Sequence, residues 1–537
     1  MADDLSPPQQ TNINRWLANT LRFTQGNPFA TTAADQERKL LPKFYVDVDG
    51  YERIKGRETM IVFAPRGGGK SALRIVLGSY AAPVSPGSET LAVEYTDFDP
   101  FITKYHRQQH LTIDDYVEYL LRAGIKALVT AFCGDPANEI LKAESSDNKQ
   151  QRVARAASLP EPTRSRLARL VSRYYPTLIE PEILYEQLSY LDATFKPDWL
   201  VFYEYVKQQR LSKLIANSPL NEDGRARLLT DLSDYANTNP HHQDTPREQM
   251  ETFVNLARAV KFTQVQFLID RLDENVETAD SPETQANVIE PLLANLPLLE
   301  IPGVAFKFFL SREARDVLMD RPAIRRDRLV DQAVTVVWDA KRLKHMLDAR
   351  LDVYSDGRYQ DLAQLFQDVR HEGSGRLLGE WVEDEMLHLA QGSPRRLLLA
   401  ARLLCEAHVT GNNVRNLLEE ADWQAAKVAL MKKMPPTLRI HATKRTAYIG
   451  DRSIHLTPQQ YKILLTLAEL GGRCDRYTLI EKVWEAKHGK EEQDFYDAAV
   501  DRAIGRLREN LGDETSHPIY LFTERGTGFI LRNYELV

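Results

Sequence analysis

Cysteine is scarce in this sequence. The 537 residues include three cysteines, and no two of them form a C-x-x-C pair. Neither a disulfide framework nor a cysteine-ligated zinc site is therefore indicated. Such cysteine usage is typical of the reducing cytosol, and we expect a cytoplasmic protein.

Long apolar runs and a strong basic excess are also missing. No stretch approaches the roughly 18 to 20 apolar residues that span a bilayer, and the N-terminal residues lack the basic and apolar regions of a signal peptide. The formal net charge is -7. No membrane partner is therefore expected, and any contact with nucleic acid must come from a local surface.

The length and composition are those of a chain with several folded domains. Hydrophobic residues make up 43% and charged residues 27% of the chain, as in ordinary globular proteins. Changes of pattern predict an N-terminal helical flank (1–50), a core in two pieces (51–139 and 256–340), a helical insertion (140–255), a helical lid (341–433) and a small C-terminal domain (438–537). What the insertion does is left open.

Five short apolar runs predict the fold of the core. They cover residues 60–64, 91–95, 265–270, 304–310 and 334–338, and helical patterns separate most of them. Strands joined by helical crossovers form a mainly parallel sheet that is covered on both faces. The core is therefore predicted to be an α/β domain with a five-stranded sheet.

A glycine-rich loop follows the first of these strands. It consists of Ala64, Pro65, Arg66, Gly67, Gly68, Gly69, Lys70 and Ser71. This run fits the pattern G-x-x-x-x-G-K-[ST], except that Ala64 replaces the first glycine. In such a loop backbone N–H groups surround the phosphates, the lysine reaches the outer ones and the hydroxyl binds Mg²⁺. The loop therefore predicts ATP and Mg²⁺ as ligands, although another nucleoside triphosphate is not excluded.

Acidic residues follow the third predicted strand. Asp270 ends that strand, which places its carboxylate at the carboxyl edge of the sheet, where it can hold Mg²⁺ through water. Asp273 and Glu274 come next, and either could polarise an attacking water. The pattern predicts an ATPase in which Lys70, Asp270 and one of these two acids act on the nucleotide.

Residues 267–274 resemble the Walker B motif of STAND NTPases, in particular NACHT-type ones, within the larger group that includes AAA+ proteins. The resemblance implies nucleotide-driven switching, slow regulatory hydrolysis and self-association. Residues 308–312 are similar to the family's strand that precedes a sensor arginine, which implies that Arg312 reads the γ-phosphate. The separation of Lys70 from Asp270 is long for this family, and the input signal therefore remains open.

A second resemblance concerns residues 392–396. The run Gly-Ser-Pro-Arg-Arg resembles the G-x-P element of STAND proteins and the sensor-2 arginine of initiator-like AAA+ proteins. Both elements contact nucleotide in those families. The resemblance therefore implies a nucleotide contact for Arg395, in the helical lid that follows the P-loop NTPase core.

The C-terminal domain carries a resemblance made of several parts. Its segments 456–465, 475–484, 500–508 and 520–529 together look like the OmpR-type winged-helix effector domain of response regulators. The likeness covers nearly all of residues 438–533. It implies an α+β winged-helix fold and double-stranded DNA as the ligand.

The third helical stretch of this domain has one apolar face. Val500, Ile504, Leu507 and Leu511 recur at helical spacing and predict a buried stripe. Arginines on the remaining surface can enter the major groove, and the wing can reach the adjacent backbone. The residues predicted to contact DNA are Arg502, Arg506, Arg508, Thr523 and Arg525.

The charge of this domain leaves a second function open. Residues 438–537 contain 15 basic and 15 acidic residues, and DNA binding usually relies on a basic excess. The first hypothesis is an ATP-operated DNA-binding regulator, most simply of transcription. The alternative is a STAND-type defence or stress sensor whose winged helix docks a protein effector. A helicase or motor is less favoured, because no further motor motif is found.

Overall fold

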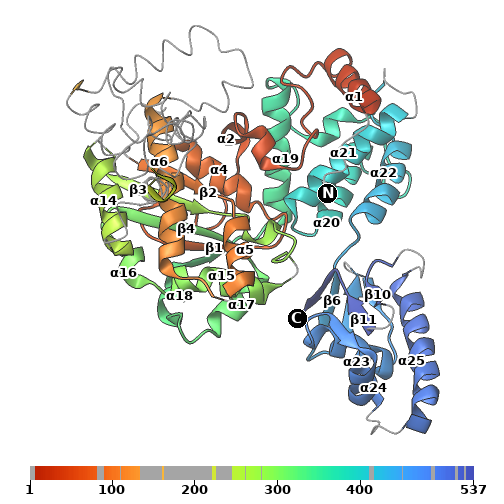
Figure 1. Cartoon of the computed structure of the whole chain (residues 1–537). Coiled ribbons are helices and arrows are strands. Elements are labelled where there is room, and N and C mark those ends of the chain that lie inside the picture. Colours follow the sequence, from red (N-terminus) through yellow and green to blue (C-terminus); the bar gives the residue numbers. More distant parts are fainter. Residues whose placement is uncertain are drawn as a thin grey trace. The chain divides into compact units, whose positions relative to one another are not determined.

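The computed structural model describes thirteen stretches of the chain, which are residues 7–80, 90–108, 110–133, 160–161, 221–224, 245–259, 262–279, 281–410, 416–449, 452–484, 490–513, 518–524 and 528–537. Most of the predicted helical insertion lies outside them. The chain divides into two compact units, of which one is Ala33–Val337 and the other combines Met1–Thr32 with Trp338–Val537. Figure 1 shows the elements of both units.

The unit Ala33–Val337 is built on a five-stranded sheet. Its strands are β1 (Met60–Ala64), β2 (Thr90–Tyr95), β3 (Gln264–Ile269), β4 (Val304–Ser311) and β5 (Ala333–Thr335). The strand order is β2-β3-β4-β1-β5, and every neighbouring pair is parallel. The predicted sheet is thereby confirmed. The last strand ends at Thr335, earlier than expected. The N–H of Val336 still donates to the carbonyl of Phe63, but the chain then leaves the sheet, and Val337 is exposed.

Helices cover this sheet. They are η1 (Ala34–Glu37), α2 (Leu41–Phe44), α3 (Tyr51–Lys55), α4 (Lys70–Tyr80), α5 (Asp99–Gln108), α6 (Ile113–Cys133), α14 (Pro246–Ala259), η2 (Leu272–Glu274), α15 (Pro282–Leu293), α16 (Leu296–Leu299), α17 (Glu313–Met319) and α18 (Arg326–Gln332). Helix α4 contacts β1, β2 and β4, while α6 packs on β2 and α14 on β3. The helix that follows the glycine loop is therefore held against three strands.

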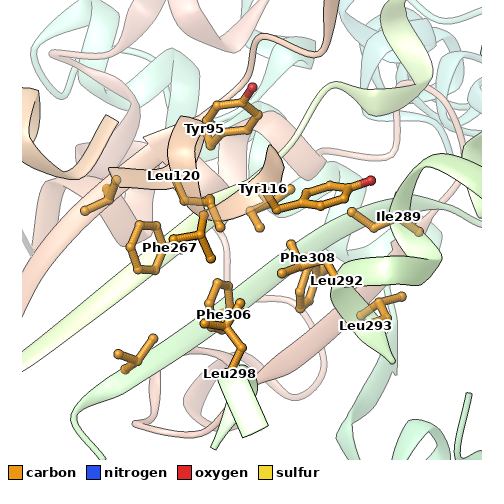
Figure 2. Packing of buried hydrophobic residues seen from close by; sticks show 14 of the residues in the cluster. Tyr95, Tyr116, Leu120, Phe267, Ile289, Leu292, Leu293, Leu298, Phe306 and Phe308 are labelled. Atoms are coloured by element: carbon orange, nitrogen blue, oxygen red, sulfur yellow. The ribbon is translucent and has the colours of Figure 1, made fainter. Parts of the chain in front are cut away.

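A large hydrophobic core lies between one face of the sheet and helices α6, α14 and α15. Figure 2 shows part of this core, where Phe267, Phe306 and Phe308 from β3 and β4 lie near labelled side chains of α6 and α15. The rings of Phe267 and Phe306 are stacked with centroids 5.2 Å apart. This packing holds β3 in place and thereby positions the acidic residues that follow it.

The second unit contains a helical part. Its elements are α1 (Pro7–Asn19), α19 (Ala340–Ser355), η3 (Leu362–Leu365), α20 (Leu378–Ala390), α21 (Pro394–Thr410) and α22 (Glu420–Lys433). Trp16 of α1 donates from Nε1 to the carbonyl of Asn416 at 3.0 Å. Its ring also lies 4.6 Å from that of His408. The N-terminal helix therefore packs with the helices that were expected to form the lid.

The same unit ends in the winged-helix domain. Its elements are β6 (Leu438–His441), β7 (Thr446–Ile449), β8 (Arg452–Ile454), α23 (Pro458–Glu469), β9 (Arg473–Asp475), α24 (Arg476–Trp484), α25 (Lys490–Leu511), β10 (Leu521–Glu524), β11 (Gly528–Leu531) and β12 (Tyr534–Leu536). They form two small sheets, ordered β12-β6-β7-β8 and β10-β11-β9. The predicted stripe of Val500, Ile504, Leu507 and Leu511 is buried, as expected.

Within the described part of the chain, no helix combines the length and the apolar character that a membrane span needs.

Candidate functional site

The glycine loop connects β1 to α4, and its backbone adopts conformations that favour glycine. Gly67 and Gly69 have φ angles of +74° and +89°, which favour glycine. A Cβ on Gly68 would lie 2.9 Å from the carbonyl oxygen of Pro65. Ala64 is the buried last residue of β1. An alanine therefore fits at the first position of the motif, while the three glycines are needed.

Lys70 begins α4, and the structure brings it to Asp273. Its Nζ lies 2.9 Å from Oδ2 of Asp273, and both side chains are buried. The ammonium also donates to the carbonyls of Ala64 and Pro65 at 3.3 and 3.5 Å. Arg66 donates to the carbonyl of Asp273 at 2.8 Å. The loop and the acidic turn after β3 are therefore connected directly.

Asp270 follows β3 and is 1% exposed. Its backbone N–H donates to the carbonyl of Tyr95 at 3.0 Å. Its carboxylate accepts from Nε of Arg74 through Oδ2 at 3.0 Å, whereas Oδ1 is buried without a hydrogen-bond partner among the described residues. A buried acceptor that lacks a donor fits the water shell of a cation.

The residues present fit Mg²⁺ only together with phosphates. The described part of the chain contains no group of three or more His, Cys, Asp or Glu that could hold a metal alone. Nucleotide-bound Mg²⁺ takes one or two protein oxygens and completes its shell with phosphates and water. The hydroxyl of Ser71, in the first turn of α4, and Oδ1 of Asp270 match that requirement in number and type.

Glu274 differs from its neighbour Asp273, because its side chain is exposed. Its Oε2 lies 3.5 Å from Nε of Arg271. Desolvation raises the pKa of Glu274 above the ordinary value, Arg271 opposes the shift, and the carboxylates of Asp270 and Asp273 add to it. A raised pKa suits a general base.

The end of β4 lies beside the glycine loop. The backbone N–H of Arg312 donates to the carbonyl of Ala64 at 3.0 Å. Ser311 donates from Oγ to Oε1 of Gln285 and accepts from the N–H of Ala314, which orders the turn. The backbone of the predicted sensor arginine is therefore adjacent to the loop. That its side chain reads the phosphate stays a prediction.

Arg395 lies in the first turn of α21, in the other unit, and its side chain is exposed. Its nucleotide contact stays a prediction. The next residue, Arg396, is 4% exposed, and its Nη1 donates to the carbonyl of Pro435 at 2.9 Å. Burial lowers the pKa of Arg396 to about 10, and the nearby Tyr520 opposes the shift.

The carbonyls of Pro435 and Pro436 also accept hydrogen bonds from the winged-helix domain. Tyr520 donates from its hydroxyl to Pro436 at 2.7 Å. Asn533 donates from Nδ2 to Pro435 at 3.3 Å and to Pro436 at 3.0 Å. The linker between the helical part and the winged helix is therefore bonded on both sides.

The predicted DNA-contacting residues divide into two groups. Arg502 and Arg506 are exposed on α25, and Arg502 donates from Nε to the carbonyl of Ala498 at 3.1 Å. Arg508 instead donates to Oγ1 of Thr523 at 2.8 Å and to the carbonyl of Leu521. These two residues tie α25 to β10. Arg525 of the wing lies outside the described residues.

Three charged residues near the loop were not predicted from the sequence. Glu94 and Asp35, which are partly exposed, form an ion-pair cluster with the buried Arg74 and Asp270. The sequence does contain an indication of a buried charge, since Arg74 lies between Leu73 and Ile75 in the helix that follows the loop. A charged side chain that the helix buries must find partners.

The C-terminal domain has relatives among known proteins. Residues 451–531 match the family model "Transcriptional regulatory protein, C terminal". A probable transcriptional regulator ycf27 of Cyanidium caldarium is 32% identical over 97 residues, which are 18% of this chain and 39% of the relative. The counterpart from Galdieria sulphuraria is 31% identical over 96 residues, 18% of this chain and 36% of the relative. The OmpR-type winged-helix prediction is thereby confirmed, while the chain spans less than two-fifths of these relatives.

Two solved structures are similar to this chain. One is the RstA DNA-binding domain of Klebsiella pneumoniae in complex with the RstA box, with 28% identity, a TM-score of 0.16, and coverage of 18% of this chain and 90% of that one. The other is the ORC2 protein of Aeropyrum pernix in ADPNP-ADP complexes, with 10% identity, a TM-score of 0.30, and coverage of 93% and 88%. Both TM-scores are low. The P-loop NTPase class of the core therefore rests on its own parallel sheet and glycine loop.

Proposed function

We propose that this protein is an ATP-dependent regulator that couples nucleotide binding and hydrolysis to DNA binding by its C-terminal winged helix. The observation that carries the proposal is the presence, in one chain, of a glycine loop bonded to the acidic turn after β3 and a domain matched to transcriptional regulators. Control of transcription is the simplest role for such a combination.

The nucleotide would bind at the amino end of α4. Backbone N–H groups of the loop and Lys70 would bind the phosphates, as the helix N-terminus favours anions. Ser71 and Asp270 would hold Mg²⁺, which neutralises phosphate charge when bound. Because Asp273 already neutralises Lys70, the exposed Glu274 is the better general base.

Two arginines are proposed to report on the nucleotide. Arg312 follows β4 next to the loop and would contact the γ-phosphate. Arg395 would contact nucleotide from the first turn of α21. Because Arg396 in the same turn is bonded to the linker, a movement of this turn would reach the winged helix. Self-association, which the AAA+ resemblance implies, would add a second level of control.

DNA would be bound by the exposed face of α25. Arg502 and Arg506 are available to read base edges in the major groove, whereas Arg508 and Thr523 support the wing and would contact the backbone. Arg525 would extend that contact.

A second candidate function is the docking of a protein effector. The observation that favours it is the ion pair between Arg476 and Asp501, which places an acid on the surface of α25 and neutralises an arginine beside it. Phosphates would be repelled by Asp501, whereas a protein partner of mixed charge would not.

Titration of one ligand against the other tests the proposal. ATP should change the affinity for the preferred duplex by about 5- to 150-fold, and DNA should change the affinity for ATP by the same factor. The variant Lys70→Ala should retain DNA binding and lose the coupling. Equal DNA binding with ATP, with ADP and without nucleotide would contradict the switch. Failure of the winged helix to enrich any duplex in a selection would favour protein docking.

A further inference from the structure

A single arginine in α4 connects three carboxylates around the candidate metal site. Arg74 lies one turn after Lys70 and is 0% exposed. Its Nε donates to Oδ2 of Asp270 at 3.0 Å, its Nη1 donates to Oε2 of Glu94, and its Nη2 donates to both oxygens of Asp35 at 2.8 and 3.0 Å. Each nitrogen of the guanidinium therefore serves a different element of the fold, namely the turn after β3, strand β2 and helix η1.

The cluster is closed by two outer arginines. Arg271 donates to Oδ2 of Asp35, and Arg38 donates to Oε2 of Glu94. Three guanidinium groups thereby face three carboxylates. Desolvation alone would raise the pKa of Asp35, but its hydrogen bonds and charge pairing with Arg74 and Arg271 lower it below the ordinary value. These contacts keep the Asp35 carboxylate ionised beside Arg74.

The two carboxylate oxygens of Asp270 differ in their hydrogen bonding because Arg74 contacts one of them. Oδ2 is held by Nε of Arg74, whereas Oδ1 is buried and has no donor among the described residues. A carboxylate turns about its Cβ–Cγ bond, so a hydrogen bond to one oxygen also sets the direction of the other. The plane of the Asp270 carboxylate is therefore set from α4.

We propose that Arg74 is a positioning residue, which, anchored by Glu94 and Asp35, holds the Asp270 carboxylate with Oδ1 available to the Mg²⁺ of a bound nucleotide. The inference rests on the proposed nucleotide site and adds residues to it. It also assigns a role to η1, because Asp35 comes from the segment before β1. A lysine cannot replace Arg74, since one ammonium does not match the planar fork that reaches three carboxylates.

The test measures Mg²⁺-dependent binding of a fluorescent ATP analogue to the full-length protein. Arg74→Lys keeps the charge and removes the fork. We expect its affinity for the analogue in EDTA to stay within about twofold of the wild-type value, whereas the Mg²⁺ concentration that gives half of the Mg²⁺-induced change rises at least tenfold. Asp35→Asn leaves the pair of Arg74 and Asp270 in place and should raise that midpoint about threefold. Binding of Mn²⁺ to the complex, followed by electron paramagnetic resonance, should weaken in the same order.

The matched control is Arg321→Lys. Arg321 is partly buried, whereas Arg74 is fully buried, and it also pairs with acids, Glu283 and Glu290. The Arg321→Lys variant should titrate Mg²⁺ like the wild type. If the Mg²⁺ midpoint of Arg74→Lys equals that of the wild type, the inference is wrong, while the proposed nucleotide site is unaffected. An equal loss of affinity in EDTA would also overturn it, because Arg74 would then support the fold alone. If Arg74→Lys does not fold, an unchanged midpoint in Asp35→Asn overturns it. Absence of analogue binding to the wild type would overturn the proposed function as well.

Discussion

Three charged side chains around the glycine loop are buried, whereas two arginines of α25 in the winged helix are exposed. Lys70, Arg74 and Asp270 are all buried, and their partners come from distant parts of the sequence. Arg502 and Arg506 are exposed, and the former has a bond within its own helix. Loss of a buried charge leaves its partner unpaired, which is costly, whereas loss of an exposed charge costs little stability. Substitutions in the two regions should therefore differ in what they damage.

The largest expected effect is on hydrolysis. Glu274→Gln should lower the rate of ATP hydrolysis by about 10²- to 10⁴-fold, because a general base contributes that much, while ATP binding persists. Single-turnover hydrolysis and equilibrium binding measure the two quantities separately. The comparison variant is Asp273→Asn, which removes the partner of Lys70. If that variant alone stops turnover, the base is Asp273.

The pH dependence of the hydrolysis rate tests whether Glu274 is the general base. A base must be deprotonated, so the rate should rise with pH through the pKa of Glu274, which is raised above its ordinary value. Glu274→Gln should lack that rising limb. A limb that persists in this variant belongs to another group.

The next effect concerns sequence preference in the exposed region. Arg506→Ala should reduce discrimination between preferred and altered duplexes by about 1 to 3 kcal/mol for each bidentate pair of hydrogen bonds to a base that it removes, without loss of domain stability. Arg508→Ala should destabilise the domain as well, since it removes the bonds to Leu521 and Thr523. Lys444→Ala removes a charge from the exposed turn between β6 and β7 and serves as the control. Equal losses for all duplexes in Arg506→Ala would mean that Arg506 binds the DNA backbone.

The cost of a buried charge can be measured in the core at Lys307. This residue is 0% exposed in β4, and burial lowers its pKa to about 7 from 10.5. Between these values the unfolded state binds more protons, so the free energy of unfolding should rise with pH across that window. Lys307→Met should lack this contribution, which we expect to be about 1 to 3 kcal/mol. Denaturant unfolding of both proteins at pH 7 and pH 10 measures it, and parallel pH curves would contradict it.

The smallest effect is expected from Asp501→Asn. This change removes an exposed negative charge from α25 and releases Arg476 from its ion pair. DNA affinity should rise about two- to fivefold at low salt, and the gain should shrink as salt increases. Titrations of one duplex at two salt concentrations test this. A loss of affinity would indicate that Asp501 contacts a base.

Local patterns were sufficient to predict the architecture and the loop. Apolar runs predicted the strands of the parallel sheet, and helical spacing predicted the buried face of α25. The end of the last strand was predicted wrongly from the apolar run at 334–338, because the sequence does not show that Val337 is exposed. The domain boundaries and the roles of the site residues stay predictions.

The charge cluster could not be predicted, for a physical reason. Arg74 is separated by 196 residues from Asp270, by 20 from Glu94 and by 39 from Asp35. No local period relates such positions, and only the folded sheet brings them together. Burial of Arg74 on its helix indicates that partners are needed, without saying which.

The linker at Pro435 and Pro436 is held by hydrogen bonds from both sides and is not a loose tether. Arg396 holds it from the first turn of α21, and Tyr520 and Asn533 hold it from the winged helix. A hydrogen bond with a charged donor contributes about 1.5 to 3 kcal/mol, which is comparable with the free energy that usually couples two sites. A movement of the first turn of α21 must therefore either move the linker with it or break the hydrogen bond from Arg396. Under the proposed function, substitution of Arg396 should abolish the coupling between ATP binding and DNA binding, while each ligand still binds.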